Sequence, residues 1–416
     1  MTGYDAVVVG ARVAGASTAL LLARAGAKVL LLERAPYGSD TLSTHGLMRA
    51  GVLQLSRWGL LDQIVAAGTP AVTRTLFHYP CCAPVQISIR ASQGVPALYA
   101  PRRQVLDRIL VDAAAEAGVQ VRHGVTVTAV LTDPHGRVIG VRAVDTAHRT
   151  FTAYARVTIG ADGIRSTVAA SVEAPVERRS TSAGAALYGY FEDLPAAGYE
   201  WAYGSGAAAG LLPTNDGQTC VFVGTSPERL RQERRGGADA AFSAVFRQAA
   251  PRLRHRLAGA TRVGRLHGWS GQPGHVRRSH GAGWALVGDA GYFRDPITTH
   301  GMTDALRDAE LLADALLASW AGDQPEAVAL AGYQATRDTL SRQLFEVSDR
   351  IAGYDWDPHE VHQLLREVSS AMSDEVGLLQ SLPARPSRPP RPSLPARPKG
   401  AGMGEFVLAD RPVGGG

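Results

Sequence analysis

The N-terminal stretch from Tyr4 to Glu33 constrains the fold more than any other part of the chain. It reads as a valine-rich strand, a glycine turn, a helix with 3.6-residue periodicity and a second apolar strand that closes on Glu33. This order is typical of a βαβ dinucleotide-binding unit. Gly10 permits the tight turn after the first strand, and Gly15 lets the helix pack close to that strand. We therefore expect a Rossmann-like α/β domain built on a parallel sheet.

The same stretch predicts a binding site for a pyrophosphate and a ribose. The N-terminus of the helix, around Ala14, offers free N–H groups and a partial positive charge to phosphate. Glu33 lies where a carboxylate can accept hydrogen bonds from ribose hydroxyls, with Arg34 beside it. The middle glycine of the G-x-G-x-x-G fingerprint is replaced by Arg12. Its side chain points either away from the turn or toward the phosphates, and we favour the phosphates because a guanidinium matches their geometry. A Rossmann-like unit without a ligand is the alternative for this stretch alone.

Length and composition place the chain among two-domain α/β proteins. Its 416 residues can form two domains, and 45% of them are hydrophobic. No apolar run reaches the length of a membrane span, so we expect a cytoplasmic protein without membrane contact. The three cysteines, Cys81, Cys82 and Cys220, have the spacing of neither a disulfide framework nor a metal site, and we expect no metal.

The net charge of +5 does not indicate a nucleic-acid-binding surface. Residues 383–399 carry five basic residues and no acidic residue, which equals the charge of the whole chain. The body is therefore neutral, and we expect no nucleic-acid partner. Seven prolines in the same stretch predict an extended and poorly packed tail, with a proline-rich docking peptide as the alternative. The scarcity of lysine beside many arginines suggests a GC-rich bacterial source.

Several further helices and strands are predicted along the chain. Residues 184–225 change to antiparallel strands separated by turns. The helices that we expect span 46–66, 103–117, 227–258, 301–320, 325–352 and 358–372. The strands span 119–130, 138–144, 157–159, 265–270 and 284–287. Polar motifs follow three of the buried strands, namely Gly10 to Gly15, Asp162-Gly163 and Gly288-Asp289.

With these three motifs in order, residues 1–350 resemble the FAD-dependent aromatic hydroxylases, the class A flavoprotein monooxygenases. Geranylgeranyl reductases and flavin-dependent halogenases share their fold. The resemblance implies that the first motif binds the ADP part of FAD, that Asp162-Gly163 lies between the flavin and nicotinamide sites, and that Asp289 binds the ribityl hydroxyls. A helix-opening arginine such as Arg103 contacts FAD in this superfamily. The cofactor contacts that we expect are Gly10, Arg12, Ala14, Gly15, Glu33, Arg34, Arg103, Val127, Asp162, Gly163, Gly288, Asp289, Gly301 and Met302.

The best match to this superfamily starts at Gly288. The chain reads GDAGYFRDPITTHGMTDALRDA where the family pattern is G-D-A-A-H-x-x-P-P-x-x-G-Q-G-M-N, ending one helix later in Asp-Ala. Gly301 opens a helix whose N–H groups would face the flavin edge that becomes negative on reduction. The positions that depart from the pattern are Tyr292, Asp295, His300 and Thr303. These changes bear on the substrate and on the fine tuning of the flavin rather than on the presence of the flavin.

The resemblance implies a hydroxylase that uses NAD(P)H and O2. NAD(P)H would reduce FAD, and O2 would form a C4a-hydroperoxide that is shielded from water and directed at an electron-rich carbon. A phenolic substrate gains from a nearby base. The residues that could serve are His45, His78, Tyr188, Tyr190, His267 and His300. His45 and His300 come first because both flank the expected flavin region, and Pro296 is the third catalytic candidate.

Two other functions compete with hydroxylation. A dehydrogenase or geranylgeranyl-type reductase uses the same FAD scaffold with a different pocket. A non-catalytic FAD-binding protein is the second alternative. Halogenation of the tryptophan-enzyme type is disfavoured, because the chain lacks a Trp-x-Trp-x-Ile-Pro segment and its two lysines are Lys28 and Lys399.

The expected domains are discontinuous in sequence. A GR2-type FAD-binding domain is assigned to 1–75, 100–180 and 276–350, with a mostly antiparallel substrate domain inserted at 76–99 and 181–275. A C-terminal helical segment spans 351–382, and the proline- and arginine-rich tail spans 383–416. We expect a monomer or homodimer whose substrate is an aromatic or polycyclic small molecule. The small residues from Gly204 to Gly210 are expected to leave room for that ligand.

Overall fold

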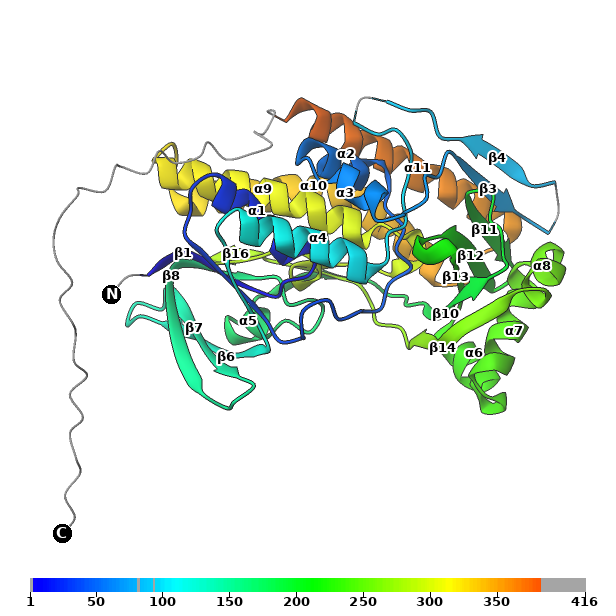
Figure 1. The fold of residues 1–416 in the computed structure, drawn as a ribbon, viewed down its shortest axis with the longest axis horizontal. Coiled ribbons are helices and arrows are strands. Elements are labelled where there is room, and N and C mark those ends of the chain that lie inside the picture. Colours follow the sequence, from blue (N-terminus) through cyan, green and yellow to red (C-terminus); the bar gives the residue numbers. More distant parts are fainter. Residues whose placement is uncertain (1–2, 81–82, 93, 383–416) are drawn as a thin grey trace, which may run out of the picture.

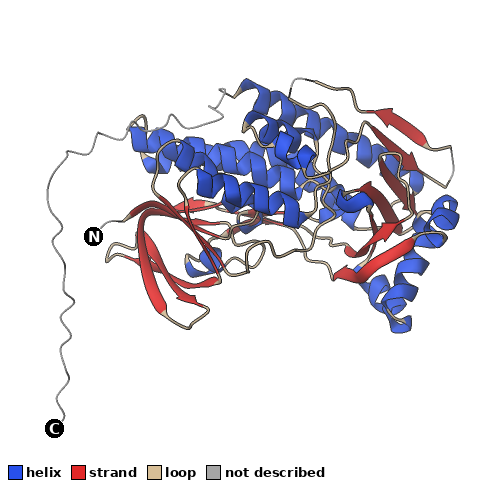
Figure 2. Ribbon diagram, viewed as in Figure 1, coloured by secondary structure: helices blue, strands red, loops and turns tan. Residues whose placement is uncertain are grey.

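The computed structural model describes residues 3–80, 83–92 and 94–382 and is organised around two large sheets (Figures 1 and 2). The predictions for the tail and for Cys81 and Cys82 lie outside these residues. Cys220 is buried and free. Within the described part of the chain, the helices lack the length and apolar character that a bilayer span requires.

The first sheet is the nucleotide-binding sheet that the sequence predicts. Its strands follow the order β16-β17-β8-β1-β2-β5, and the pairs from β17 to β5 are parallel. A β6–β7 hairpin joins it through β8. The strands are β1 (Tyr4–Val9), β2 (Val29–Glu33), β5 (Gln120–His123), β6 (Val125–Thr132), β7 (Val138–Asp145), β8 (Thr150–Gly160), β16 (His280–Gly281) and β17 (Trp284–Leu286).

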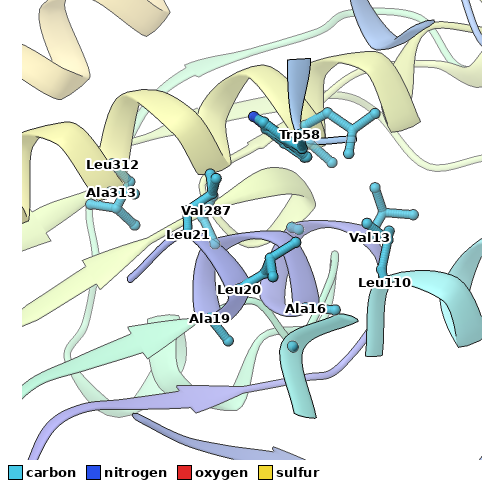
Figure 3. Close-up of a cluster of buried hydrophobic side chains, with 14 of the residues drawn as sticks. Val13, Ala16, Ala19, Leu20, Leu21, Trp58, Leu110, Val287, Leu312 and Ala313 are labelled. Atoms are coloured by element: carbon cyan, nitrogen blue, oxygen red, sulfur yellow. The ribbon is translucent and has the colours of Figure 1, made fainter. Parts of the chain in front are cut away.

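Helices α1 (Val13–Arg24), α4 (Arg103–Glu116) and α9 (Gly301–Ala321) cover one face of this sheet (Figure 1). Their apolar residues form one buried cluster with the strands, which includes Leu20, Leu110 and Leu312 (Figure 3). The opposite face packs against the β6–β7 hairpin and α5 (Thr167–Ser171). Both faces are therefore covered, which explains the continuous apolar runs of β1 and β2.

The second sheet draws its strands from the segments assigned to the substrate domain. Its order is β14-β10-β13-β12-β11-β3-β4, and all neighbours are antiparallel except β3 and β11. The strands are β3 (Arg74–His78), β4 (Val85–Ser88), β10 (Ala185–Glu192), β11 (Tyr199–Gly204), β12 (Ala207–Pro213), β13 (Thr219–Thr225) and β14 (Thr261–Trp269). A small third sheet has the order β18-β15-β9 and comprises β9 (Val176–Arg179), β15 (His275–Arg277) and β18 (Tyr292–Phe293).

Two long C-terminal helices, α10 (Glu326–Ala352) and α11 (Pro358–Ser381), connect the two halves of the molecule. Apolar residues of both helices pack in one cluster with aromatic residues of β10 to β13, for example Val347 and Leu364 with Trp201. The other face of the second sheet packs against α7 (Ala238–Ala249), through Phe242 and Phe246. The central strands β10 to β13 are thus buried on both sides, whereas the edge strands β4 and β14 are largely exposed.

Three predicted helices differ from the observed ones, each for a local reason. The helix expected at 46–66 is two helices, α2 (Arg49–Arg57) and α3 (Leu61–Ala66), because Gly59 has a φ of 71°. The segment 227–258 is divided into α6 (Pro227–Glu233), α7 (Ala238–Ala249) and α8 (Arg254–Ala258), since Gly237 has a φ of 94° and Pro251 interrupts the pattern. The last helix extends to Ser381 rather than 372.

The expectation that Gly204 to Gly210 leave room for a ligand is wrong. A Cβ at Gly204 would overlap the backbone of Gln248 on α7, and a Cβ at Gly210 would overlap the ring of Phe222. The alanines between them are fully buried. Small residues here allow α7 and neighbouring side chains to approach β12 closely, so they serve packing rather than a cavity.

Candidate active site

The glycine turn after β1 has the geometry of a phosphate-binding loop. Gly10 has a φ of 100°, and a Cβ there would overlap the carbonyl of Ala161, at the end of the neighbouring β8. A Cβ at Gly15 would overlap the carbonyl of Gly10. Helix α1 begins at Val13 without a side-chain cap. Its first N–H groups are therefore free to bind an anion.

Asp107 organises the arginines beside this turn, and the sequence analysis missed it. Its carboxylate accepts from the guanidinium of Arg12 at 2.9 Å and from that of Arg103 at 3.1 and 3.2 Å. Arg12 also donates to the carbonyl of Ser39 at 2.6 Å. The charge of Arg12 is therefore already paired, and its side chain points toward α4. The signal that could have identified Asp107 is its position four residues after Arg103 on one helical face.

Glu33 is buried at the end of β2, where it fixes the glycine turn. It accepts from the backbone N–H of Ala11 at 2.7 Å and of Ala35 at 2.9 Å. The cavity that it lines with Arg12, Ser39 and Asp107 is where the sequence places a ribose. Two other expected cofactor contacts lie differently, since Arg34 is exposed and Val127 is buried among the apolar residues of β6.

The Asp162-Gly163 motif follows β8 and begins α5. The carboxylate of Asp162 accepts from the hydroxyl of Ser166 at 2.5 Å and from the backbone N–H of Thr167 at 2.6 Å. Burial raises the pKa of Asp162, and the hydrogen bonds, which lower the pKa, only partly offset this effect. Gly163 has a φ of 79°, and a Cβ there would meet open space. The observed role of Asp162 is thus to hold the first turn of α5.

Asp289 lies where the strand end of β17 meets the N-terminus of α1. A Cβ at the preceding Gly288 would lie 2.8 Å from the Cβ of Ala14, so the two motifs are in contact. Burial raises the pKa of Asp289 to about 6, although nearby Arg103 opposes the shift. Its carboxylate accepts no hydrogen bond within the described part of the chain. It is thus a half-buried acceptor available to ligand hydroxyls.

The loop before α9 is strained and is attached to the second sheet. Asp295 accepts from the backbone N–H of Gly184 at 2.6 Å and of Ile297 at 3.0 Å, and burial raises its pKa to about 6. Pro296 starts a short turn that ends at Thr299, whose φ of 51° is unusual for a β-branched residue. A Cβ at Gly301 would meet nothing within 4 Å. The uncapped start of α9 therefore faces open space.

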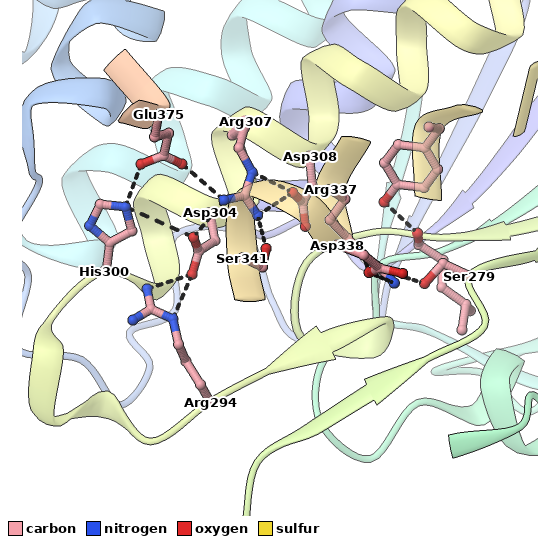
Figure 4. Close-up of polar contacts among 12 residues, drawn as sticks. Ser279, Arg294, His300, Asp304, Arg307, Asp308, Arg337, Asp338, Ser341 and Glu375 are labelled. Atoms are coloured by element: carbon pink, nitrogen blue, oxygen red, sulfur yellow. Dashed lines mark hydrogen bonds and ion pairs between the residues drawn. The ribbon is translucent and has the colours of Figure 1, made fainter. Parts of the chain in front are cut away.

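His300 is fully buried and is held by the C-terminal helix. Its Nε2 lies 2.6 Å from a carboxylate oxygen of Glu375 on α11 (Figure 4). A carboxylate only accepts, so Nε2 carries the proton and donates. Nδ1 of His300 has no partner among the described residues. Glu375, 75 residues away in sequence, was not predicted.

A buried ion-pair network surrounds His300 (Figure 4). Asp304 binds Arg294 at 2.7 Å and Arg307 at 3.1 Å, and Glu375 binds Arg307 at 3.0 Å. Burial raises the pKa of Asp304, but the two arginines outweigh it and hold the pKa low. His300, Asp304 and Glu375 have ligand atoms close enough for a metal ion. The arginines already occupy those carboxylates, which favours an ion-pair network over a cation site.

The other candidate base, His45, is the centre of an aromatic cluster between the two sheets. Its Nε2 lies 2.5 Å from the hydroxyl of Tyr190 on β10, and its Nδ1 has no partner among the described residues. The guanidinium of Arg102 lies 3.6 Å from the centre of the Tyr190 ring. Tyr188 stacks on His267 with 4.9 Å between ring centres. Four of the six predicted proton-transfer residues therefore gather in one place.

Burial fixes the protonation states in this cluster. It lowers the pKa of His45 well below its usual range, with nearby Arg102 adding to the effect. It raises the pKa of Tyr190 and brings that of Tyr188 to about 12. His45 is thus neutral at pH 7 and both phenols keep their protons. His78, by contrast, binds Glu200 at 3.0 Å away from this cluster.

The loops that carry the two histidines pack on each other. A Cβ at Gly46 would lie 2.5 Å from the methyl group of Thr299, and the Ser43 hydroxyl lies 3.9 Å from the sulfur of Met302. His45 has a φ of 65°, so both loops contain a residue in the left-handed region. Strained backbone of this kind is concentrated at functional sites.

The residues present fit FAD. The uncapped α1 and the open Gly10 turn suit a pyrophosphate, and Asp289 offers a free acceptor for hydroxyls. The open N-terminus of α9 suits a flavin edge. The unpaired ring nitrogens of His45 and His300 are buried polar atoms that a bound group could satisfy.

Comparisons with known proteins agree with this assignment. Residues 3–348 match the family model described as FAD binding domain. Digeranylgeranylglycerophospholipid reductase 2 of Methanopyrus kandleri is 28% identical over 355 residues, which cover 80% of this chain and 81% of the relative.

Two solved structures share the fold. The flavin-dependent brominase Bmp2 has a TM-score of 0.75 at 19% identity and covers 91% of this chain and 98% of its own. PqsL, a probable FAD-dependent monooxygenase from Pseudomonas aeruginosa, has a TM-score of 0.74 at 21% identity. The match covers 89% of this chain and 100% of the PqsL chain. The fold class that the sequence predicts is confirmed. The chain belongs to the FAD-binding-domain family and is an FAD-dependent oxidoreductase.

Proposed function

We propose that this protein is a monooxygenase that uses NAD(P)H and O2 to hydroxylate an aromatic or polycyclic small molecule. The observation that carries the proposal is the buried contact between His45 and Tyr190. The Nδ1 atom of His45 has no partner among the described residues. The loop that carries His45 contacts Met302 at the start of α9 through Ser43. FAD, when bound, supplies the redox chemistry and the activation of oxygen. The protein supplies binding, orientation and proton positions.

His45 presents a hydrogen-bond donor to the substrate. Because burial keeps the proton on Tyr190, its hydroxyl donates to Nε2 of His45. A neutral imidazole that accepts at Nε2 carries its proton on Nδ1. Nδ1 can then donate to a phenolate or enolate oxygen and stabilise the negative charge that makes the neighbouring carbon electron-rich.

The surroundings of this pair favour an aromatic substrate. Tyr188, Tyr190 and His267 present rings on one face of β10 and β14, and the guanidinium of Arg102 stacks on one of them. Planar ligands stack well on such rings. Arg102 pairs with Asp40 at 3.6 Å and donates to Gln218 at 3.1 Å, so it holds the Tyr190 ring in place while its own charge is balanced.

A reductase acting on an isoprenoid is the second candidate, and the relative from Methanopyrus kandleri is the observation that favours it. The likeness to the brominase is below 25% identity and supports the fold alone. Lys28, the one lysine in the described residues, stacks on Tyr4 with 5.1 Å to the ring centre, at the start of the first sheet. It is therefore poorly placed to handle hypohalous acid beside His45.

Anaerobic reduction of the bound flavin tests the proposal. We expect NADH or NADPH to bleach the flavin absorbance, and an aromatic ligand with a phenol or carboxylate to accelerate this step. A flavin that neither nicotinamide reduces, with or without such ligands, would contradict the proposal. Acceleration by isoprenoid quinones or prenyl lipids alone would favour the reductase.

A further inference from the structure

The positive charge of the described chain is concentrated in one segment. Residues 227–266, which include α6, α7 and α8, contain ten arginines and three acidic residues. Their net charge of +7 exceeds the +5 of the whole chain. The charge of the chain outside residues 383–399 is zero in sum but is therefore unevenly distributed. The basic helices α6, α7 and α8 lie together at one end of the second sheet (Figure 1).

A cavity of about 390 Å³ opens in this basic segment, between α7, α8 and the strands β10 and β14. This volume is in the range of small-molecule sites. Phe191, Phe242 and Phe246 line it and form a stacked series, with ring centres 5.8 and 6.3 Å apart and planes within 23° of each other. The three residues are 7%, 4% and 1% exposed, so they form the floor of the cavity, against which one edge of a planar or acyl group can pack.

The polar part of the cavity is basic. Arg247, Arg254, His255 and Arg262 line it. Asp239 is the acidic residue among the lining residues, and it is paired with Arg262. Arg247 and Arg254 are exposed, and neither makes an ion pair with a carboxylate within the described residues. An anionic group at this mouth would therefore meet two uncompensated guanidinium groups.

The cavity is separate from the candidate active site. Successive side chains of a strand point to opposite faces, so Phe191 faces away from its neighbours Tyr188 and Tyr190. Phe191 packs in the cluster with α7, whereas Tyr188 and Tyr190 pack in the cluster on the other face. The sheet itself divides the cavity from His45.

We propose that this cavity is a second binding site, for a small amphipathic anion with an aromatic or acyl body and one carboxylate, sulfonate or phosphate group. The aromatic series would take the apolar body, and Arg247 and Arg254 would bind the anion. The proposal does not depend on the reaction proposed above, because a sheet separates the two sites.

Calorimetric titration of the FAD-saturated protein with naphthalene-2-sulfonate tests this site. Naphthalene-2-sulfonamide has the same body without the charge, and methanesulfonate has the anion without the aromatic body. We expect the sulfonate to bind and both controls to bind at least about tenfold more weakly. Equal binding of the sulfonamide would overturn the assignment of an anion site.

Variants locate the binding. Arg247→Gln and Arg254→Gln should each weaken sulfonate binding about tenfold, the loss expected for one charged hydrogen bond. Ser243→Trp should abolish it, since this exposed residue lines the cavity and an indole would fill the space. Arg235→Gln is the matched control, an exposed arginine of the same segment outside the lining, and should bind as the parent does.

Two results would contradict the second site. An equal loss in Arg235→Gln would assign the binding to the general positive field of the helices. Unchanged binding in Ser243→Trp would place the ligand elsewhere, including the active site. Near-UV circular dichroism and the flavin spectrum of each variant should match the parent, so that a folding defect is recognised independently.

Discussion

The Nε2 atom of His45 and the hydroxyl of Tyr190 lie 2.5 Å apart although the residues are 145 positions apart in sequence. The contact joins a loop of the nucleotide-binding half to β10 of the second sheet. Because burial keeps His45 neutral and Tyr190 protonated, the pair orients one imidazole tautomer. The chemistry proposed for this protein depends on that orientation.

Two substitutions distinguish the ring nitrogens of His45. His45→Asn places an amide near Nδ1 and tolerates the left-handed backbone at φ 65°, whereas His45→Gln places its amide near Nε2. We expect the kcat of His45→Asn to be at least about tenfold higher than that of His45→Gln. Loss of a proton-transfer group typically lowers kcat by about 10²–10⁴-fold, so this difference is measurable. FAD content should stay unchanged in both. Equal or higher activity in His45→Gln would assign the function to the nitrogen that faces Tyr190.

Asp289→Asn should weaken FAD binding and stabilise the protein without FAD. Loss of a charged acceptor weakens binding by roughly 1.5–3 kcal/mol, measured by flavin titration. The folded pKa of about 6 lies above the ordinary 3.8, so folding disfavours the charged carboxylate above pH 6. The free energy that corresponds to this pKa shift must be reduced because the side chain is partly exposed. The substitution should then stabilise the apoprotein by about 1–2 kcal/mol at pH 8.

The pH dependence provides the check on this prediction. The stabilisation by Asp289→Asn should decline as the pH falls from 6 to 4, because the folded parent carboxyl becomes protonated below its pKa of about 6 while the unfolded one stays charged down to 3.8. Denaturant unfolding at pH 8 and pH 4.5 measures it. A variant that is less stable than the parent at pH 8 would show that the carboxylate is needed by the protein rather than by the ligand.

Glu375→Ala should destabilise the protein by about 1–3 kcal/mol, because it leaves the buried Nε2–H of His300 without its acceptor, whereas Arg307 keeps Asp304 and Asp308. The matched control is Asp374→Ala, which removes an exposed carboxylate from the adjacent position of α11. We expect its stability to change by less than about 0.5 kcal/mol. Chemical denaturation compares the two, and equally small changes in both variants would show that the buried contacts of Glu375 add no net stability.

Two glycine-to-alanine substitutions test the packing of the nucleotide-binding turn. Gly15→Ala cannot be accommodated without moving α1, since its Cβ would overlap the carbonyl of Gly10. We expect a loss of about 3 kcal/mol or more of stability together with FAD binding. Gly332→Ala in α10 meets open space and should stabilise by about 0.5–1 kcal/mol. A tolerated Gly15→Ala that keeps FAD would contradict the observed geometry.

The parts of this fold that the sequence predicts well are those with local signals. The strand, glycine turn and helix from Tyr4 to Glu33 depend on periodicity and on backbone conformations that glycine favours. The segment from Gly288 to Asp308 follows the same logic. The helix breaks at Gly59 and Gly237 were missed, because apolar periodicity continues across a glycine that ends a helix.

The contacts that complete the candidate site were not predictable from sequence. Asp107 and Glu375 are acidic residues on helices, where the usual expectation is a solvated face. Only the packing of α4 against α1, and of α11 against α10 and α2, buries them beside arginines. Residue type alone identified the histidines and tyrosines that could transfer protons. Only the tertiary structure shows that His45 contacts Tyr190 in the aromatic cluster, whereas His78 binds Glu200 outside it.

Turnover under labelled oxygen gas separates hydroxylation from reduction. We predict that one atom of ¹⁸O2 appears in the product, with one NAD(P)H oxidised for each substrate hydroxylated when coupling is tight. His45→Gln should then consume NAD(P)H without forming the labelled product. Product that forms equally well without oxygen, with another electron acceptor and without the label, would contradict the monooxygenase assignment and favour the reductase.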